Sequence, residues 1–312
     1  MRFWVYLKPY SRWFIVGITL FFLLQALIRH WQEVTTIQIN SRGWATLAGA
    51  WCVTFLAHIW SGWVWTWILG ELNQQVNNYQ FVRVYLKTNI AKYLPGNIWH
   101  YYGRITAAKD AGIATSIATL SVLLEPLLMA AAALIIVLLG IFFEVTNHRF
   151  LLILLSLLGL ATILVGIHPW FLSRAIRLLG KLKLKKNSNQ QIDSNSHIII
   201  RYPLNPLLGE MGFVLLRGSG FLLTLLAFSS LELAQLPLLL GTFSLAWLLG
   251  LIIPGAPGGL GVFEATAIAL LQHRLSPSIV IGAIAFYRLV SILAETAAAA
   301  LAWLDERHLN FN

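Results

Sequence analysis

The chain has 312 residues, of which 58% are hydrophobic and 11% are charged, whereas a soluble domain carries about 25% charged residues. This composition excludes a soluble globular protein, because too few polar side chains remain to cover a water-facing surface. A net charge of +10 would suggest nucleic-acid binding in a soluble protein. Here the basic residues gather beside apolar runs, which is the pattern of a membrane protein.

Apolar runs long enough to cross a bilayer follow one another along the chain. A spanning helix needs about 20 apolar residues, so we predict an all-α polytopic integral membrane protein with about six to eight transmembrane helices. We interpret the first run as a retained span, because no cleavage site of small residues ends it. The predicted apolar windows are Trp13–Ile28, Trp44–Leu69, Ala114–Phe143, Phe150–Ile167, Met211–Leu231, Leu238–Ile253, Val262–Leu271 (too short to span) and Ile279–Trp303.

The lysines and arginines divide unevenly between the loops. Sixteen of the 22 lie in residues 1–12, 71–113, 169–210 and the tail. Because cytoplasmic loops carry the excess of positive charge, we expect a multi-pass protein of the plasma (inner) membrane with both termini in the cytoplasm. We predict a single transmembrane domain over residues 1–312, with a first unit at about 1–168, a basic cytoplasmic connector at 169–210 and a second unit at about 211–312.

Two Pro-Gly segments interrupt the helical pattern. The first contains Leu94-Pro95-Gly96, and the second, residues 254–261, reads PGAPGGLG before the piece that is too short to span. Proline removes a backbone donor and glycine loosens a helix, so in contact with lipid these segments would leave costly unpaired backbone groups. We therefore predict one or two broken or re-entrant segments that pack against protein or line a wet cavity. The alternatives are a surface loop for the first segment and an ordinary cytoplasmic turn for the second.

The two breaks suggest an internal repeat. Glu125 lies 30 positions after Pro95, and Arg288 lies 31 positions after Pro257. The charge distribution puts the first break on the inner side, and a hairpin at residues 238–271 that enters from the outer side would give the two units opposite orientation. Inverted repeats with broken helices build the substrate site of many secondary transporters, and we hypothesise the same arrangement here.

Five ionisable residues lie within the apolar windows or the second break: Glu125, Arg217, Glu264, Arg288 and Glu295. A charged residue costs about 2.5–3.5 kcal/mol at the centre of an inserted helix, so we expect these residues to face the bundle interior. Arg288 and Glu295 are two helical turns apart and share one helix face. Two interpretations stay open: an ion-pair network that only fixes helix packing, or a conduit for polar headgroups or protons.

Residues 92–104 interleave cations with aromatic side chains. Lys and Arg attract lipid phosphates, and Trp and Tyr prefer the headgroup level of a bilayer, so this segment favours a position near lipid headgroups. The sequence contains no P-loop, no Gly-x-Ser-x-Gly nucleophile elbow and no His-Glu-x-x-His zinc helix. We therefore expect no enzymatic activity, no metal and no cofactor; a membrane-embedded enzyme assembled from scattered residues is the alternative.

The segments AKYLPGNIWHYYGR (residues 91–104) and PGAPGGLGVFEA (residues 254–265) resemble the two signature segments of the lysylphosphatidylglycerol synthase transmembrane, or flippase-like, family. The resemblance covers essentially the whole chain and implies a polytopic protein that moves or handles lipids. It assigns the first motif to Lys92, Tyr93, Pro95, Gly96, Trp99 and Arg104, and the second to Pro257, Gly258, Gly259, Gly261 and Glu264.

Some members of that family carry a soluble aminoacyl-transferase domain that synthesises aminoacylated phosphatidylglycerol, and others are joined to polyprenyl-phosphate glycosyltransferases. The chain ends at Asn312, directly after its last predicted span. We therefore expect it to lack both soluble domains, together with the synthase activity.

The leading hypothesis is a lipid translocase-like protein that handles the headgroup of a phospholipid or a polyprenyl-linked lipid. Lys92 and Arg104 would attract the lipid phosphate at the inner face, and Glu264, Arg288 and Glu295 would form the path or a proton-coupled gate. The expected partners are anionic phospholipids or polyprenyl-phosphate-linked lipids, with no nucleic acid. The alternative is a non-catalytic membrane partner of a lipid-modifying enzyme or a glycosyltransferase; a homo-oligomer is also compatible with the sequence.

Overall fold

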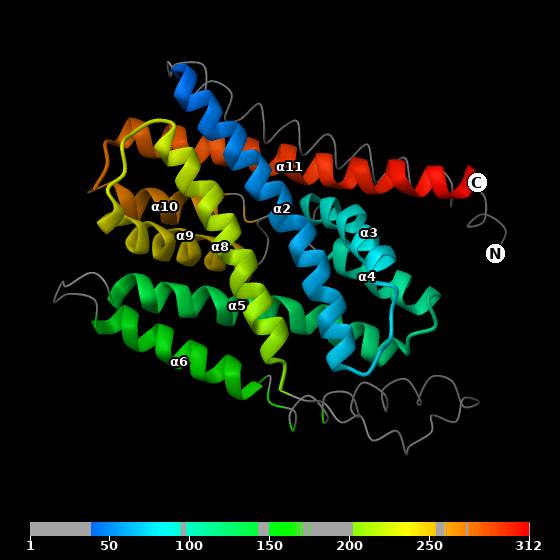
Figure 1. Ribbon diagram of the computed structural model, residues 1–312. Coiled ribbons are helices and arrows are strands. Elements are labelled where there is room, and N and C mark those ends of the chain that lie inside the picture. The colour runs from blue at the N-terminus through cyan, green and yellow to red at the C-terminus, as the bar shows by residue number, and fades with distance from the viewer. Residues whose placement is uncertain are drawn as a thin grey trace.

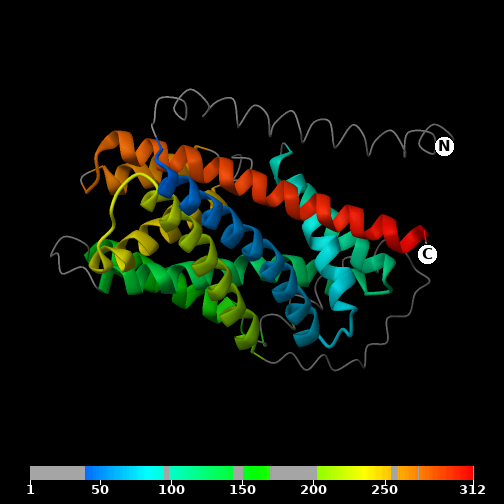
Figure 2. The same cartoon turned by 45° about the horizontal axis from the view of Figure 1, so that its top comes forward.

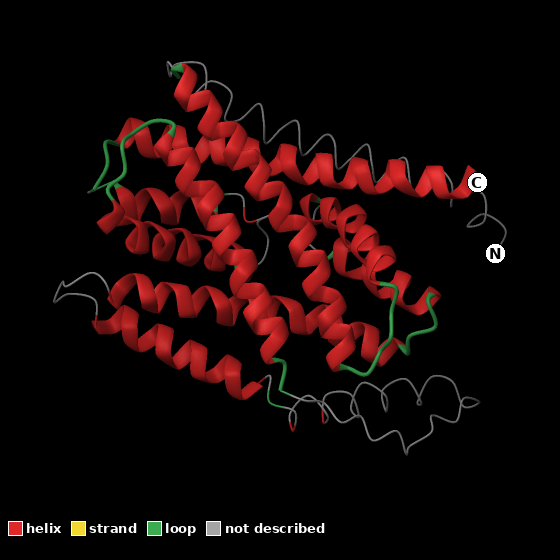
Figure 3. Cartoon of the chain, viewed as in Figure 1, coloured by secondary structure: helices red, strands yellow, loops and turns green. Residues whose placement is uncertain are grey.

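The computed structural model of the chain is built from helices, and no strand forms among the residues that it describes (Figure 3). The described residues are 39–94, 98–142, 150–166, 202–253, 261–272 and 274–311, with the single residues His168, Trp170, Arg174 and Gly259. The predicted first span and most of the basic connector lie outside these ranges. For the described part of the chain, the predicted all-α polytopic membrane architecture is confirmed.

Five of the described helices are long and apolar enough to cross a bilayer, and two shorter apolar helices accompany them. The five are α2 (Ser41–Glu71), α5 (Thr115–Phe142), α8 (Leu204–Leu226), α9 (Leu236–Ile252) and α11 (Pro277–Phe311), and the two are α6 (Phe150–Gly166) and α10 (Val262–Leu271). The helix α9 reaches spanning length together with the short helix before it, over Leu233–Ile252. The helix α10 has the bounds that the apolar pattern predicted, and it is too short to span.

The predicted window Met211–Leu231 is wrong at both ends, because α8 occupies Leu204–Leu226. The residues from Leu204 to Gly209 are mostly apolar, but Glu210 interrupts the hydrophobic run. The prediction therefore assigned residues 204–210 to the connector and began the span after the glutamate. In the structure Glu210 is fully buried within the span. The correction moves one acidic residue from the connector into the membrane-spanning part of the protein.

Both Pro-Gly breaks separate two helices that pack against each other as hairpins. The first hairpin consists of α3 (Asn78–Asn89), the short helix η1 (Ile90–Tyr93) and α4 (Trp99–Asp110). The second consists of α9 and α10, preceded by η2 (Leu233–Gln235). The helices α3, α4 and α10 are too short to cross a bilayer, whereas α9 together with η2 is long enough. A re-entrant course for the two segments stays a prediction.

The same order of elements occurs twice, and corresponding spans run in opposite directions (Figures 1 and 2). In the first half α2 is followed by a hairpin and then by α5; in the second half α8 is followed by a hairpin and then by α11. The helices α2 and α8 lie side by side and antiparallel, and the Trp60 indole N–H donates to the Gly209 carbonyl across their contact at 2.8 Å. This arrangement is the one that an inverted repeat predicts; the limits of the two units stay a prediction.

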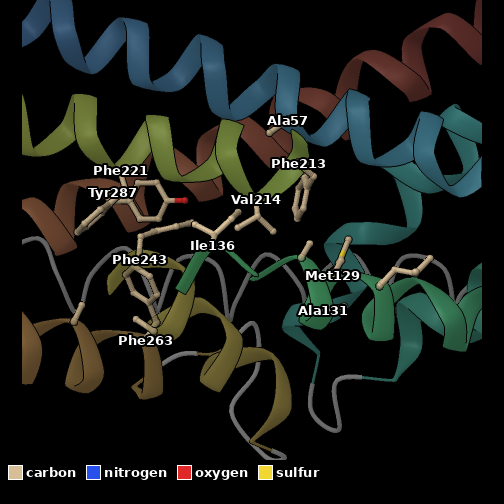
Figure 4. Packing of buried hydrophobic residues seen from close by; sticks show 14 of the residues in the cluster. Ala57, Met129, Ala131, Ile136, Phe213, Val214, Phe221, Phe243, Phe263 and Tyr287 are labelled. Carbon is tan, nitrogen blue, oxygen red and sulfur yellow. The ribbon is translucent and has the colours of Figure 1, made fainter. Parts of the chain in front are cut away.

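An aromatic cluster joins the second hairpin to the rest of the second half (Figure 4). Phe221 of α8, Phe243 of α9, Phe263 of α10 and Tyr287 of α11 pack with ring centroids 5.4–6.1 Å apart. Mutual edge-to-face and stacked packing of such rings adds to the hydrophobic burial. The Tyr287 hydroxyl also donates to the Arg217 carbonyl at 3.2 Å. The cluster therefore fixes the relative positions of α8 and α11, two helices that carry buried charged residues.

We expect Gly140→Ala to destabilise the protein by about 1–3 kcal/mol, the usual cost of overpacking. A Cβ atom at Gly140 in α5 would lie 2.6 Å from the Pro237 carbonyl oxygen and 2.9 Å from the Gly241 Cα of α9, which are backbone atoms that have little room to yield. Thermal unfolding in detergent measures the effect. The matched control is Gly70→Ala in α2, where nothing lies within 4 Å; equal losses from the two changes would contradict this close approach of α5 and α9.

Candidate functional site

A cavity of about 110 Å³ lies at the centre of the bundle, where the ends of the two hairpins meet α2, α5, α8 and α11. Its described polar lining consists of His58, Tyr85, Asn89, Lys92, Tyr93, His100, Tyr101, Arg104, Glu125, Arg217, Tyr287, Arg288 and Glu295. Met129, Phe213, Trp247, Leu251 and Phe263 supply most of the apolar part. The cavity is large enough for several water molecules, and its walls carry most of the charges buried in the spans.

Glu295 of α11 holds three elements of the cavity together. Its Oε1 atom lies 2.7 Å from Lys92 Nζ of the first hairpin, 3.2 Å from His58 Nε2 of α2 and 3.6 Å from an Arg217 nitrogen of α8. The glutamate side chain is 1% exposed. A buried carboxylate of this kind is tolerated because cations and hydrogen-bond donors surround it, and here those partners come from both halves of the chain.

Arg104 and Glu125 form a second buried ion pair, which ties α4 of the first hairpin to α5. The Tyr85 hydroxyl donates to Glu125 Oε1 at 2.7 Å, and Ser61 lies 2.6 Å from the same hydroxyl. A second nitrogen of Arg104 lies 3.5 Å from the Asn89 side-chain oxygen. The side chains that line the cavity here are those of Tyr85, Asn89, Arg104 and Glu125.

Arg288 of α11 holds the second hairpin by two contacts. Its Nε donates to Glu264 Oε1 at 2.5 Å, and its Nη2 donates to the Gly259 carbonyl at 2.9 Å. The other Glu264 oxygen accepts the Gly261 N–H at 2.6 Å, which caps the start of α10. Gly261 has φ 87°, a left-handed conformation that glycine adopts without strain, so a glycine at this position lets the cap form.

The four cations of the cavity lie over aromatic rings. Arg104 is 3.7 Å from the Tyr85 ring centroid, Arg217 is 5.4 Å from that of Tyr287, Arg288 is 5.1 Å from that of Phe263, and Lys92 is 5.3 Å from that of Tyr93. An aromatic face attracts a cation without neutralising its charge. The rings therefore help to stabilise these four positive charges within the bundle.

The first hairpin lies outside the five spans, and His100 and Lys92 are two of its titratable groups that line the cavity. Burial lowers the pKa of His100 to about 2, and the nearby positive charges of Arg104 and Lys92 act in the same direction, so its imidazole is neutral at physiological pH. Burial also lowers the pKa of Lys92, while the Glu295 carboxylate opposes that shift. The hairpin thus brings one neutral ring and one paired ammonium group to the cavity.

Among the described residues, the structure brings together the predicted site residues from distant parts of the chain, with Trp99 as the exception. Lys92, Tyr93, Arg104, Glu125, Arg217, Gly259, Arg288 and Glu295 line the cavity, and Gly261 and Glu264 lie directly behind Arg288. Trp99 is 45% exposed and does not line the cavity, which is consistent with a bilayer-facing position on α4. Pro95, Gly96, Pro257 and Gly258 lie outside the described residues.

Sequence reasoning missed two polar residues of the spans. His58 lies in a tryptophan-rich window whose aromatic residues are typical of a lipid interface, and a lone histidine there gives no signal of its own. Glu210 was placed in the connector because the start of α8 was predicted seven residues too late. Its position one turn beyond Pro206, inside an apolar run, is the signal that would have found it.

Comparison with known proteins identifies the family of the chain. A family model described as "Lysylphosphatidylglycerol synthase TM region" matches residues 14–299. The chain belongs to this family. The match confirms the resemblance that the two Pro-Gly motifs suggested. The matched range includes every described residue that lines the cavity. No curated protein sequence matches the chain at a significant level.

Proposed function

We propose that the protein is a lipid translocase-like protein whose central cavity holds the headgroup of an anionic phospholipid or a polyprenyl-phosphate-linked lipid. The acyl or polyprenyl chain stays in the bilayer while the headgroup occupies the polar interior. The observation that carries this proposal is the charge of the cavity. Lys92, Arg104, Arg217 and Arg288 line it, whereas only two lining residues, Glu125 and Glu295, are acidic.

Counting Glu264 behind Arg288, four cations face three carboxylates, so a surplus of one positive charge remains in the described part of the site. A surplus charge is expensive within a bilayer. It favours a ligand that supplies one negative charge, and a lipid phosphodiester does so. Membership in the lysylphosphatidylglycerol synthase TM region family supports a role in lipid handling.

The proposal also covers the membrane in which the protein lies and the kind of work that it does there. We place the protein in the plasma membrane with both termini in the cytoplasm, because sixteen of the 22 basic residues fall in the loops assigned to that side. On this proposal it moves or holds lipid and makes or breaks no covalent bond. A non-catalytic partner of a glycosyltransferase would use the same cavity to present a lipid without releasing it on the other side.

Lys92→Gln should slow headgroup translocation at least tenfold, which corresponds to a barrier increase of about 1.4 kcal/mol. The change removes a cation that lines the cavity and part of the support of Glu295. The assay follows fluorescent phosphatidylglycerol in reconstituted liposomes through the accessibility of the label to a membrane-impermeant quencher.

The matched control for this assay is Lys109→Gln, at an exposed position at the end of α4, which should translocate at the wild-type rate. Fluorescent phosphatidylcholine tests the charge requirement, because its headgroup has no net charge. No translocation by the wild-type protein, or equal rates for the two lipids, would contradict the proposal. Lipid binding without translocation, together with copurification of a glycosyltransferase, would support the partner role instead.

A further inference from the structure

Glu210 is a buried acidic residue that the proposed translocation site leaves unexplained. It lies in the spanning helix α8, is 0% exposed, and neither of its carboxyl oxygens has a hydrogen-bond partner among the described residues. An isolated carboxylate in such a place would have lost its hydration without gaining a counter-ion, so the neutral, protonated form is strongly favoured. The position of Glu210 without a counter-ion therefore fits the carboxylic acid form.

The charged groups near Glu210 come from the first half of the chain. Glu125 of α5 and Arg104 of α4 are the two charges whose fields act on its carboxyl, and the field of Glu210 in turn reaches the Tyr85 hydroxyl of α3. Arg104 is already paired with Glu125. One guanidinium thus serves two carboxyl groups, and the group of three is electrically balanced when one of the carboxyls is protonated.

The other titratable groups that line the cavity from the helices packed against α8 have other partners. His58 of α2 and Arg217 of α8 itself lie against Glu295 of α11, which also pairs with Lys92. Tyr287 of α11 donates to a backbone carbonyl of α8. On α9, the sequence from Leu236 to Ile252 contains no titratable residue. Arg104 is therefore the described cation whose charge acts on Glu210.

Arg104 has one N–H donor that an ionised Glu210 could use. Its Nε atom is buried and makes no hydrogen bond to a described residue, while its other nitrogens contact Glu125 and Asn89. An ionised Glu210 would compete with Glu125 for this guanidinium. Because Arg104 and Glu125 both line the cavity, a change in the protonation of Glu210 reaches the place where the headgroup is proposed to bind.

We propose that Glu210 is a proton-binding site that sets the charge of the cavity and so couples the binding of an anionic headgroup to the binding of one proton. With Glu210 protonated, the four cations exceed the three other carboxylates by one, and one phosphodiester anion restores neutrality. With Glu210 ionised, four carboxylates balance four cations and the anion loses its counter-charge. This inference rests on the proposed function.

The proton balance of the cycle is simple. The Glu210 carboxylate accepts one proton from water in the cavity as the headgroup enters, and the carboxylic acid returns one proton to water when the headgroup leaves. No bond other than the O–H bond of the carboxyl group forms or breaks. Loaded with a headgroup and a proton, or empty of both, the site is neutral, and these are the two forms that cross a low-dielectric interior at least cost.

Infrared difference spectroscopy tests the protonation of Glu210 without any transport. At neutral pH the wild-type protein loaded with short-chain phosphatidylglycerol should show the carbonyl band of a protonated carboxylic acid that is absent from Glu210→Gln, and this band should be retained in Glu232→Gln, which changes an exposed glutamate between α8 and α9. Glu125→Gln should also abolish the band, because Glu210 then becomes the only carboxyl left to balance Arg104. A band that survives in Glu210→Gln or in Glu125→Gln would overturn the inference.

Lipid affinity tests the coupling itself. Short-chain phosphatidylglycerol should bind the wild-type protein about tenfold more weakly for each pH unit above the titration of Glu210, measured between about pH 5 and pH 9. Glutamine at position 210 is permanently neutral, so the affinity of Glu210→Gln should not vary with pH over this range, whereas Glu232→Gln should behave like the wild type.

The two proposals fail in different ways. If the wild type binds phosphatidylglycerol with an affinity that does not vary with pH, or if Glu210→Gln keeps the wild-type pH dependence, the proton coupling is wrong and the translocation proposal stands. If the wild type binds neither phosphatidylglycerol nor short-chain phosphatidylcholine in the cavity, the proposed function fails, whatever the infrared result.

Discussion

Replacing Glu295 by glutamine should lower the free energy of unfolding by about 3–5 kcal/mol, the usual cost of removing one partner from a buried ion pair. The glutamate faces the cations Lys92 and Arg217 and lies 3.2 Å from His58 Nε2. Without its negative charge, two buried cations from different halves of the chain would repel each other. Because η1, α8 and α11 meet at this carboxylate, the loss should loosen the first hairpin from the rest of the bundle. Thermal unfolding of the purified variant in detergent measures it.

The matched control is Glu306→Gln, which removes the partner of Lys87 at a distance of 2.6 Å. The Glu306 side chain is 47% exposed, and exposed ion pairs of this kind contribute at most about 1 kcal/mol. The double variant Glu295→Gln with Lys92→Gln should recover part of the stability, because it removes one of the stranded cations. A loss in Glu295→Gln no larger than in the control would show that the cations do not depend on this carboxylate.

The sequence predicts the spans and the positions of the breaks because both depend on local chemistry. Apolar run length gives a transmembrane helix, and the Pro-Gly segments end helices where the hairpins turn. The helix period also places Arg288 and Glu295 on one face of α11, and both are buried there as expected. The family resemblance follows from the same two segments, and the family match over residues 14–299 confirms it.

Local sequence patterns do not predict which buried charges pair with each other. Lys92 and Glu295 are 203 residues apart, and their contact exists only because the first hairpin ends against α11. A hydropathy pattern says that a buried charge needs a partner but does not say which one. Glu210 shows the converse problem: its polarity moved the predicted start of a helix, although a neutral carboxylic acid is compatible with a span.

The two hairpins are held by ion pairs of opposite polarity. In the first half the cation, Arg104, is on the hairpin and the carboxylate, Glu125, is on the following span. In the second half the carboxylate, Glu264, is on the hairpin and the cation, Arg288, is on the following span. Equivalent places in an inverted arrangement thus carry the same bond with its charges exchanged. Each pair is positioned to hold one hairpin against the cavity. The pair of the second half, Glu264 and Arg288, can be tested by a conservative substitution of its arginine.

Arg288→Lys should slow headgroup translocation at least tenfold, a barrier increase of about 1.4 kcal/mol, while the fold survives. A guanidinium presents several N–H donors in a fixed fork, whereas an ammonium is a point charge on a flexible stem. Arg288 uses that fork to hold Glu264 and the Gly259 carbonyl at once. Lysine keeps the positive charge and the attraction to Glu264 but loses the simultaneous geometry, so the second hairpin should lose its fixed position beside the cavity.

The matched control is Arg83→Lys, which alters an arginine that contacts Asp305 at 3.2 Å outside the cavity and should leave translocation at the wild-type rate. A stability measurement separates the role of the hairpin from a general loss of structure. The free energy of unfolding of Arg288→Lys should lie within about 2 kcal/mol of the wild-type value, because the charge and most of the packing remain.

The exchanged pair, Glu264→Arg with Arg288→Glu, reproduces the polarity of the first half and should recover part of the activity that Glu264→Arg alone removes. Wild-type translocation by Arg288→Lys would show that the fork geometry is dispensable, and the second hairpin would then be held by the aromatic cluster around Phe263 rather than by its ion pair.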